Sequence, residues 1–140
     1  MKIAGIITEY NPFHNGHAYQ IEKVRQETGS DYVVIVMSGD FVQRGEPAVL
    51  DKYVRAHMAL ENGADLVLEL PVAFACAGAE YFARGGVSIL NSLGCIDTLC
   101  FGTEQEHLSD FEQVASLLSR EPVDFQQLLL SYLKKGMGYP

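Results

Sequence analysis

The hydrophobic residues of the chain fall into two alternating patterns. Four short apolar runs resemble strands that are buried on both faces of a parallel sheet, and they lie at 3–7, 32–37, 65–70 and 94–101. Segments with apolar residues at helical spacing separate or follow these runs, and they lie at 18–28, 51–61, 80–93, 109–118 and 125–135. The alternation predicts an α/β fold: a Rossmann-like, doubly wound parallel sheet with helices on both faces.

The ends of the predicted helices carry residues that favour such ends. Gly29 follows the first helix, where glycine readily adopts the left-handed conformation that ends many helices. Asp51 precedes the second helix as its N-cap residue. Gly85 and Gly86 lie within the third helix and mark either a break or a close approach to a neighbouring element. The pattern predicts no element for the segment 72–78.

The turn between the first strand and the first helix carries the chemistry. Its sequence ends in His-Asn-Gly-His, from His14 to His17, directly before the helix. A helix N-terminus offers unpaired backbone N–H groups and the positive end of the helix dipole, which together favour an anion. Gly16 lacks the Cβ that would keep a phosphate away from the backbone. Two imidazoles can donate to phosphate oxygens and stabilise charge that develops in a transition state. The turn therefore indicates nucleotide chemistry.

The residues of this turn fit a longer pattern, (S/T)-x-x-(D/N)-P-x-H-x-G-H, through Thr8, Asn11, Pro12, Phe13, His14, Gly16 and His17. The stretch resembles the HxGH signature of the nucleotidylyltransferase superfamily, whose members attack the α-phosphate of ATP and release pyrophosphate. Within that superfamily, the segments 9–17 and 37–47 resemble the bacterial tRNA(Met) cytidine acetate ligases. The resemblance implies that acetate and ATP give acetyl-adenylate, and that the acetyl group then passes to N4 of the wobble cytidine of elongator tRNA(Met).

The resemblance also implies which residues bind ATP, with Mg²⁺ carried on the triphosphate. His14 and His17 are the expected catalytic residues; zinc binding or a purely structural role are the alternatives. Nucleotide contacts are expected from the turn, the first helical residues and the glycine after the fourth strand: Ile7, Thr8, Glu9, Tyr10, Asn11, Pro12, Phe13, His14, Asn15, Gly16, His17, Ala18, Tyr19, Gln20 and Gly102.

Several of these positions have a structural alternative. The Thr8 hydroxyl could bond its own loop instead of a phosphate, and Gly102 could be a turn glycine instead of lying against the adenine or ribose. Glu9 and Asn11 are expected to shape the loop through bonds from their side chains to the backbone.

The loop after the second strand raises the question of the acceptor. Arg44 and Lys52 are candidate substrate contacts, because a guanidinium or an ammonium can bind a carboxylate or a phosphate; otherwise they are solvated charges. A phosphorylated acceptor, such as pantetheine phosphate or nicotinamide mononucleotide, would require several basic side chains. An adenylyltransferase of that kind stays an alternative, as does a non-catalytic nucleotide- or RNA-binding module.

The charge and composition of the chain restrict which partners it can be expected to bind. The net charge of −8 argues against an independent tRNA-binding chain, because phosphate backbones are bound by Lys and Arg. A tRNA would be bound through a local basic surface or through sequence that this chain lacks. No apolar run approaches the roughly 20 residues that span a bilayer. The N-terminus leads directly into the motif instead of a signal peptide, so we expect a cytoplasmic protein without membrane contact.

The sequence also leads to expectations for the domain organisation and for the cysteines and histidines outside the motif. Residues 1–140 are expected to form one nucleotidylyltransferase-like, ATP-binding domain. The resemblance implies a fifth strand and a later phosphate-binding segment, and neither is found, so the chain is expected to be the N-terminal part of a longer protein. The cysteines are expected to be small buried hydrophobes, without a metal site or disulfide. His57 and His107 have no identifiable partner and are assigned no role.

Overall fold

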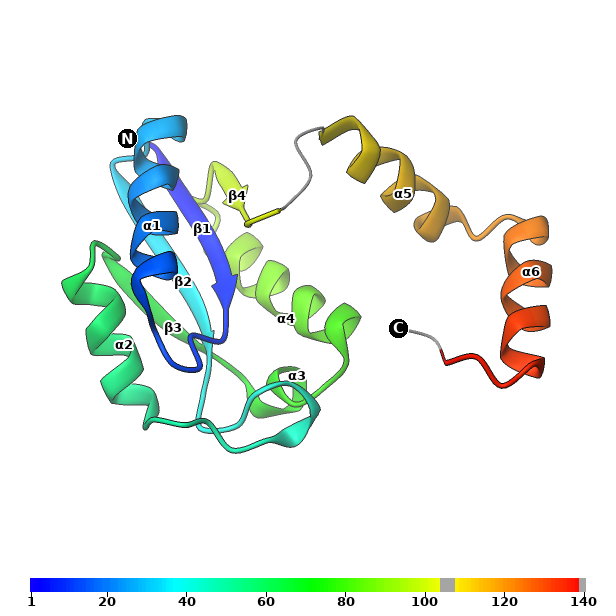
Figure 1. The fold of residues 1–140 in the computed structure, drawn as a ribbon. Coiled ribbons are helices and arrows are strands. Elements are labelled where there is room, and N and C mark those ends of the chain that lie inside the picture. The colour runs from blue at the N-terminus through cyan, green and yellow to red at the C-terminus, as the bar shows by residue number, and fades with distance from the viewer. Residues whose placement is uncertain (104–107, 139–140) are drawn as a thin grey trace. The chain divides into compact units, whose positions relative to one another are not determined.

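A computed structural model describes residues 1–103 and 108–138 of the chain. They divide into two compact units, residues 1–102 and 103–140. The described part of the first unit contains a four-stranded parallel sheet with the strand order β3-β2-β1-β4 (Figure 1). Its strands are β1 (Ile3–Thr8), β2 (Tyr32–Ser38), β3 (Leu66–Leu70) and β4 (Thr98–Cys100). The predicted α/β fold with a parallel sheet is confirmed.

The strand register brings the ends of the central strands together. β1 pairs with β2 up to Thr8 opposite Met37, and β2 pairs with β3 up to Ser38 opposite Leu70. All strands are parallel, so their carboxyl ends lie at one edge of the sheet. The loops that follow β1 and β2 are therefore neighbours, which is the arrangement that forms binding sites in open α/β sheets.

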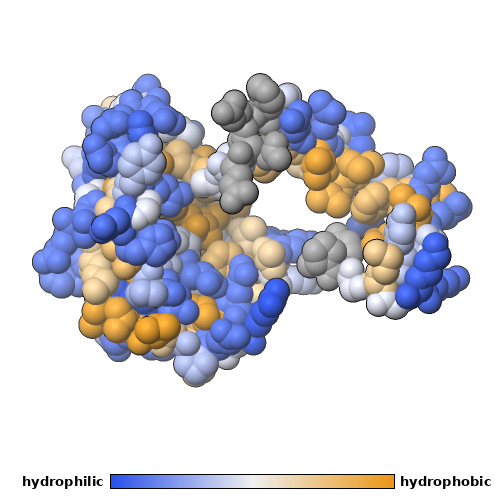
Figure 2. Space-filling model, in the orientation of Figure 1, coloured by the Kyte–Doolittle hydropathy of each residue, from blue (hydrophilic) through white to orange (hydrophobic). Residues whose placement is uncertain are grey.

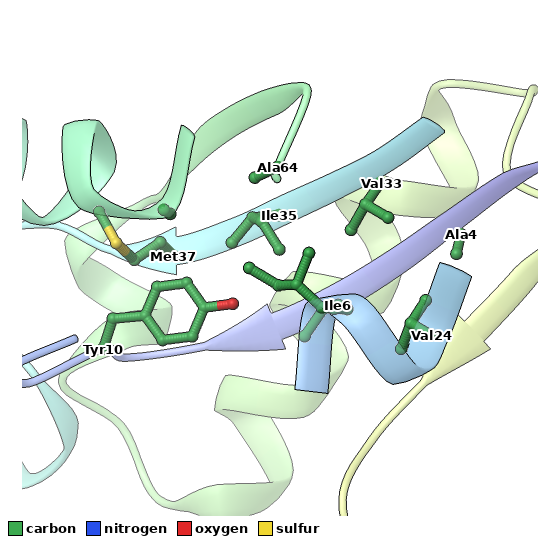
Figure 3. Packing of buried hydrophobic residues seen from close by; sticks show 10 residues of the cluster. Ala4, Ile6, Tyr10, Val24, Val33, Ile35, Met37 and Ala64 are labelled. Carbon is green, nitrogen blue, oxygen red and sulfur yellow. The ribbon is translucent and has the colours of Figure 1, made fainter. Parts of the chain in front are cut away.

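Helices cover both faces of this sheet, as the sequence predicts. On one face, α1 (Asn15–Thr28) and α2 (Lys52–Glu61) pack on a buried cluster, most of which Figure 3 shows. Its members are Ala4, Ile6, Tyr10, Ile21, Val24, Val33, Ile35, Met37, Ala59 and Ala64. On the other face, α3 (Val72–Ala75) and α4 (Ala79–Ser92) pack on Ile3, Val34, Val36, Leu70, Ala75, Phe82 and Leu90. Alternate residues of β2 serve the two clusters, as expected for a strand buried on both faces.

The two glycines inside α4 mark a close approach and not a break. α4 is continuous from Ala79 to Ser92. A Cβ on Gly86 would lie 2.6 Å from Cγ2 of Ile7, and a Cβ on Gly85 would lie 2.6 Å from Cγ of Phe74. The helix can therefore lie this close to β1 and α3 only because these positions lack side chains.

Some predicted bounds differ from the structure. α1 begins at Asn15, three residues before the predicted start, because His14 already caps the helix. β4 is shorter than the predicted run 94–101: Gly94 has a φ of 67° and follows the C-cap of α4, so the chain is still turning there. The unassigned segment 72–78 contains the short helix α3. Cys95 is exposed, so the prediction that the cysteines are buried is wrong at that position.

The second unit contains two described helices, α5 (Leu108–Arg120) and α6 (Val123–Lys134). Apolar side chains gather along one side of α5 (Figure 2), where Val114, Leu117 and Leu118 are exposed. Both helices match the predicted segments to within a few residues. The assignment of residues 1–140 to one ATP-binding domain stays a prediction. Of the helices in residues 1–103 and 108–138, none has the length and apolar character needed to cross a membrane.

Candidate active site

The loop between β1 and α1 is built around Tyr10. Its backbone has a φ of 47°, its side chain is 1% exposed, and the peptide bond between Asn11 and Pro12 is cis. The Tyr10 ring packs edge-on against Phe13, with ring centroids 4.8 Å apart, and against the His17 imidazole at 4.6 Å. Burial raises the pKa of Tyr10, so its hydroxyl stays neutral. Tyr10 therefore acts as an apolar support beneath His17.

His14 and His17 cap the helix for each other. His14 is the N-cap residue, and its Nδ1 accepts a hydrogen bond from the Gly16 backbone N–H at 3.1 Å. In return, Nδ1 of His17 accepts from the His14 backbone N–H at 3.3 Å. A neutral imidazole that accepts through one nitrogen carries its proton on the other. Both rings therefore present an Nε2–H donor, which is the group that a phosphate oxygen needs.

The two imidazoles also stack, with centroids 3.7 Å apart and an interplanar angle of 23°. Partial burial lowers the pKa of His17, and the neighbouring His14 lowers it further. His17 is therefore a neutral donor at neutral pH, and not a cation.

Gly16 has a more immediate role than the one assigned from the sequence. A Cβ at this position would lie 2.9 Å from Cε1 and 3.0 Å from Nδ1 of His14. The first neighbour of Gly16 is thus the imidazole that caps its own N–H. The glycine allows the ring of His14 to lie against the helix start, and an anion would meet the Nε2–H groups of the two rings.

The loop after β2 is fastened to this turn by two side chains. Oε1 of Glu9 accepts from the backbone N–H of Gln43 at 2.8 Å, and Oδ1 of Asn11 accepts from the backbone N–H of Val49 at 2.7 Å. Glu9 and Asn11 do bond to backbone groups, but these belong to the loop after β2 and not, as the sequence predicted, to their own loop.

Arg55 is the residue of the site that the sequence analysis missed. Its side chain is fully buried, and its guanidinium donates to four backbone carbonyls. Nε donates to Leu50 at 2.9 Å, Nη1 donates to Glu9 at 2.6 Å and to Ser38 at 3.1 Å, and Nη2 donates to Gly39. One side chain of α2 thus joins the loops after β1 and β2. Its position four residues before the buried Ala59, on the inward side of α2, is the signal that could have indicated it.

The structure places the two candidate acceptor residues differently. Arg44 is exposed in a short 3₁₀ turn, Gln43–Gly45, with a φ of 66°. Lys52 is the first residue of α2, and its Nζ lies 3.0 Å and 2.8 Å from the two carboxylate oxygens of Glu69 and 3.8 Å from Asp40. The hydrogen bond to Glu69 is the main cause that raises the pKa of Lys52. Lys52 is therefore a cation with two carboxylate neighbours, and not a free one.

The remaining predicted nucleotide contacts lie around this turn or behind it. Thr8 is the last residue of β1 and is half-buried, at the carboxyl edge of the sheet. A Cβ on Gly102 would lie 3.9 Å from Nε2 of Gln20, which places Gly102 beside α1. Ile7 packs with the cluster on the opposite face of the sheet. Tyr19 is 60% exposed.

The other two histidines lie outside this turn. His57 does have a partner, since its Nε2 lies 3.2 Å from Glu61 one helical turn away. His107 lies outside the described residues. Among the described residues, no group of three or more His, Cys, Asp or Glu side chains is arranged to hold a metal ion.

A parallel sheet with a His-x-Gly-His helix start at its first βα turn defines a nucleotidyl transferase. The family model described as HIGH Nucleotidyl Transferase matches residues 1–140, and the chain belongs to this family. The chain is 49% identical over 140 residues to a tRNA(Met) cytidine acetate ligase of Clostridium novyi, and 53% identical to one of Caldicellulosiruptor saccharolyticus. Both alignments include 100% of this chain and 35% of the length of the relative.

Solved structures of the same kind superpose closely. A crystal structure of Thermotoga maritima TmcAL bound with alpha-thio ATP matches with a TM-score of 0.92 and 46% identity, covering 100% of this chain and 34% of that one. An apo form of the same protein matches with a TM-score of 0.93. The resemblance inferred from the motif is confirmed. The chain spans about a third of the length of these relatives, and the contacts of individual residues with a nucleotide stay predictions.

Proposed function

We propose that this chain carries the ATP site of an enzyme that activates acetate and transfers the acetyl group to N4 of the wobble cytidine of elongator tRNA(Met). The observation that carries the proposal is the pair of imidazoles of His14 and His17 at the start of α1, whose Nδ1 atoms both accept backbone N–H groups and leave the Nε2–H groups as donors. The names of the relatives and the alpha-thio ATP in the Thermotoga maritima structure support the substrate class.

In the first step, a carboxylate oxygen of acetate attacks the α-phosphorus of ATP. The bond from that phosphorus to the oxygen bridging the α- and β-phosphates breaks, and pyrophosphate leaves with the electron pair. His14 and His17 donate to phosphate oxygens as charge develops there; a Mg²⁺ ion carried on the triphosphate would, when bound, offset further charge. The step requires alignment and charge stabilisation, without a covalent bond to the protein.

In the second step, the cytidine N4 attacks the acetyl carbon of acetyl-adenylate. The bond from that carbon to the phosphate oxygen breaks, AMP leaves with the electron pair, and N4 loses one proton. The product is N4-acetylcytidine.

The charges of the loop after β2 favour this reading over a phosphorylated acceptor. Of the three cations between residues 39 and 55, Lys52 faces two carboxylates and Arg55 donates to four backbone carbonyls. Arg44 is the one cation of that described segment with neither an ion pair nor a hydrogen bond to another described residue. One exposed guanidinium suits a small monoanion better than a phosphate dianion.

Pyrophosphate–ATP exchange tests the proposal. The assay is run with acetate, with phosphopantetheine, or with neither, on this chain and on the longest natural form of the protein. We expect exchange that requires acetate, and a loss of about 10²–10³-fold in His17→Ala, the usual cost of removing one transition-state donor.

His57→Ala is the matched control, because His57 is an exposed histidine on α2 whose partner is Glu61. It should leave the exchange rate unchanged. Exchange that requires phosphopantetheine would assign the chain to the adenylyltransferase alternative. Nucleotide binding without any exchange in the longest form would assign it to the binding-module alternative.

A further inference from the structure

A cavity of about 220 Å³ opens beside the proposed ATP site, between the ends of β2 and β3 and the first turns of α2. Met37 and Val67 form part of its apolar floor, and Lys52, Tyr53 and Glu69 bring polar groups to it. The space far exceeds the roughly 10–15 Å³ that one water needs. It is smaller than the roughly 300–1,000 Å³ typical of sites for drug-sized ligands. The size suits a single flat ring.

The charges of the cavity oppose an anionic ligand. One ammonium, Lys52, faces the carboxylates of Glu69 and Asp40, so the local balance is negative. A carboxylate or phosphate entering here would have to displace a tethered carboxylate of the protein. A neutral ligand with an amino group meets the opposite situation, because the Glu69 side chain is about half exposed (51%) and a carboxylate can accept several hydrogen bonds at once.

The order of donor and acceptor matches one edge of a nucleobase. Glu69 offers an acceptor, and the Lys52 ammonium beside it, at 2.8 Å, offers a donor. The Watson–Crick edge of cytosine presents the complementary pair, an N4 amino donor next to the N3 and O2 acceptors. Uracil would instead turn its O4 acceptor toward the Glu69 carboxylate, which is repulsive.

Tyr53 supplies a surface for stacking. It follows Lys52 on α2, lines the cavity and is 74% exposed, so its ring is accessible to a ligand. The Lys52 Nζ lies 5.5 Å from the centre of this ring. Single-stranded bases that are read by proteins are commonly stacked on such rings.

The cavity is physically connected to the histidine pair. Met37, on its floor, belongs to the same buried cluster as Tyr10, and Figure 3 shows the two side chains near each other. Tyr10 in turn supports His17 at 4.6 Å. Arg55 binds the carbonyl of Gly39, which lines the cavity, and the carbonyl of Glu9, which precedes Tyr10. The cavity and the histidine turn are therefore linked through Met37, Tyr10 and Arg55.

We propose that this cavity receives the acceptor cytosine. Tyr53 stacks on the base, Lys52 donates to its ring acceptors, and Glu69 accepts from N4 and takes the proton that N4 releases when it attacks the acetyl carbon. The inference rests on the proposed function and adds the position and the recognition of the acceptor base.

The test measures two rates on the longest natural form of the protein: acetate-dependent pyrophosphate exchange, and transfer of labelled acetyl to a tRNA(Met) transcript. The readout is the ratio of transfer to exchange, which a general loss of folded protein does not change. Glu69→Gln keeps the shape of the side chain but removes the charge that takes the proton. We expect its ratio to fall at least tenfold. Tyr53→Ala should lower the ratio about tenfold, the usual cost of a lost stack, and Tyr53→Phe should restore it.

An exposed glutamate and an exposed tyrosine elsewhere on the described surface serve as matched controls. Glu61→Gln changes an exposed carboxylate of α2, and Tyr81→Ala changes an exposed ring of α4, so both should leave the ratio unchanged. Unchanged ratios in Glu69→Gln and Tyr53→Ala, with normal wild-type exchange and transfer, would overturn the cavity assignment and leave the proposed function intact. Exchange and transfer that fall in parallel would also overturn it, since the ratio of transfer to exchange would then be unchanged. A wild type without either activity would refute the proposed function itself.

Discussion

A single substitution at Arg55 should clearly lower the free energy of unfolding, because this residue holds the loops of the site together. Its guanidinium is fully buried and holds four carbonyls, those of Glu9, Ser38, Gly39 and Leu50. Burial is the main cause that lowers its pKa, but a guanidinium remains charged at any ordinary pH. In Arg55→Met the apolar stem is kept and every donor is lost.

The magnitude follows from the carbonyls that are left behind. An unsatisfied buried polar group costs about 1–3 kcal/mol, and hydrogen bonds from charged donors lie at the upper end. Water can reach some of the four carbonyls once the guanidinium is absent, so we expect a loss of at least about 3 kcal/mol in the free energy of unfolding. Arg55→Lys keeps a charge with three donors on one atom, which cannot span four carbonyls, and should lose less.

Urea unfolding followed by circular dichroism measures this loss from the midpoint and the slope. Arg25→Met is the matched control, because Arg25 also donates to two carbonyls, those of Asp31 and Gly63, and to the Asp65 carboxylate, but its side chain is about one-third exposed (32%). The control should lose about 1 kcal/mol. A loss in Arg55→Met no larger than in Arg25→Met would refute the conclusion that Arg55 joins the two loops energetically.

Three further predictions follow from single contacts. Gly86→Ala should destabilise by about 1–3 kcal/mol in urea unfolding, because its Cβ would overlap Ile7, whereas Gly138→Ala, with open space around it, should change little. Lowering the pH from 7 to 5 should reduce the free energy of unfolding more in the wild type than in His17→Gln. The pKa of His17 is lower in the folded protein than in the unfolded chain, so the unfolded chain takes up the proton first, near pH 6.5, and is stabilised by it. Asp51→Ala should lose about 1 kcal/mol with the cap of α2, and Asp51→Asn should retain most of it; equal losses would contradict the cap.

Local patterns in the sequence predicted the strands and helices well. β2 is a continuous apolar run because both of its faces are covered, and such a run is visible without a structure. Asp51 caps α2 as predicted, since capping depends on residues two positions apart. The histidine pair was located for the same reason, because its order and spacing lie within one turn of chain.

The features that the sequence did not reveal depend on contacts between distant segments. Arg55 resembles any solvated helix residue until the carbonyls 16 and 46 positions earlier are seen to reach it. The sequence did not reveal that Glu69, 17 residues after Lys52, is placed beside it by the parallel pairing of β2 and β3; a substrate contact of Lys52 stays a prediction. Gly16 was assigned to a phosphate because the position of the His14 ring follows from its side-chain torsions, which no pattern reports.

These contacts explain how an acidic chain can carry a site for a polyanion. The described groups at the carboxyl edge of the sheet are mostly neutral donors or ions that already have partners. His17 is held neutral, Lys52 faces two carboxylates, and the Arg55 guanidinium donates to backbone carbonyls. Such groups fix direction without adding net positive charge, which is how preorganised dipoles stabilise a transition state. In the proposed function, Mg²⁺ carried on the triphosphate would offset part of its charge. The net charge of −8 is therefore compatible with the proposed site, in which ATP would be oriented by hydrogen bonds.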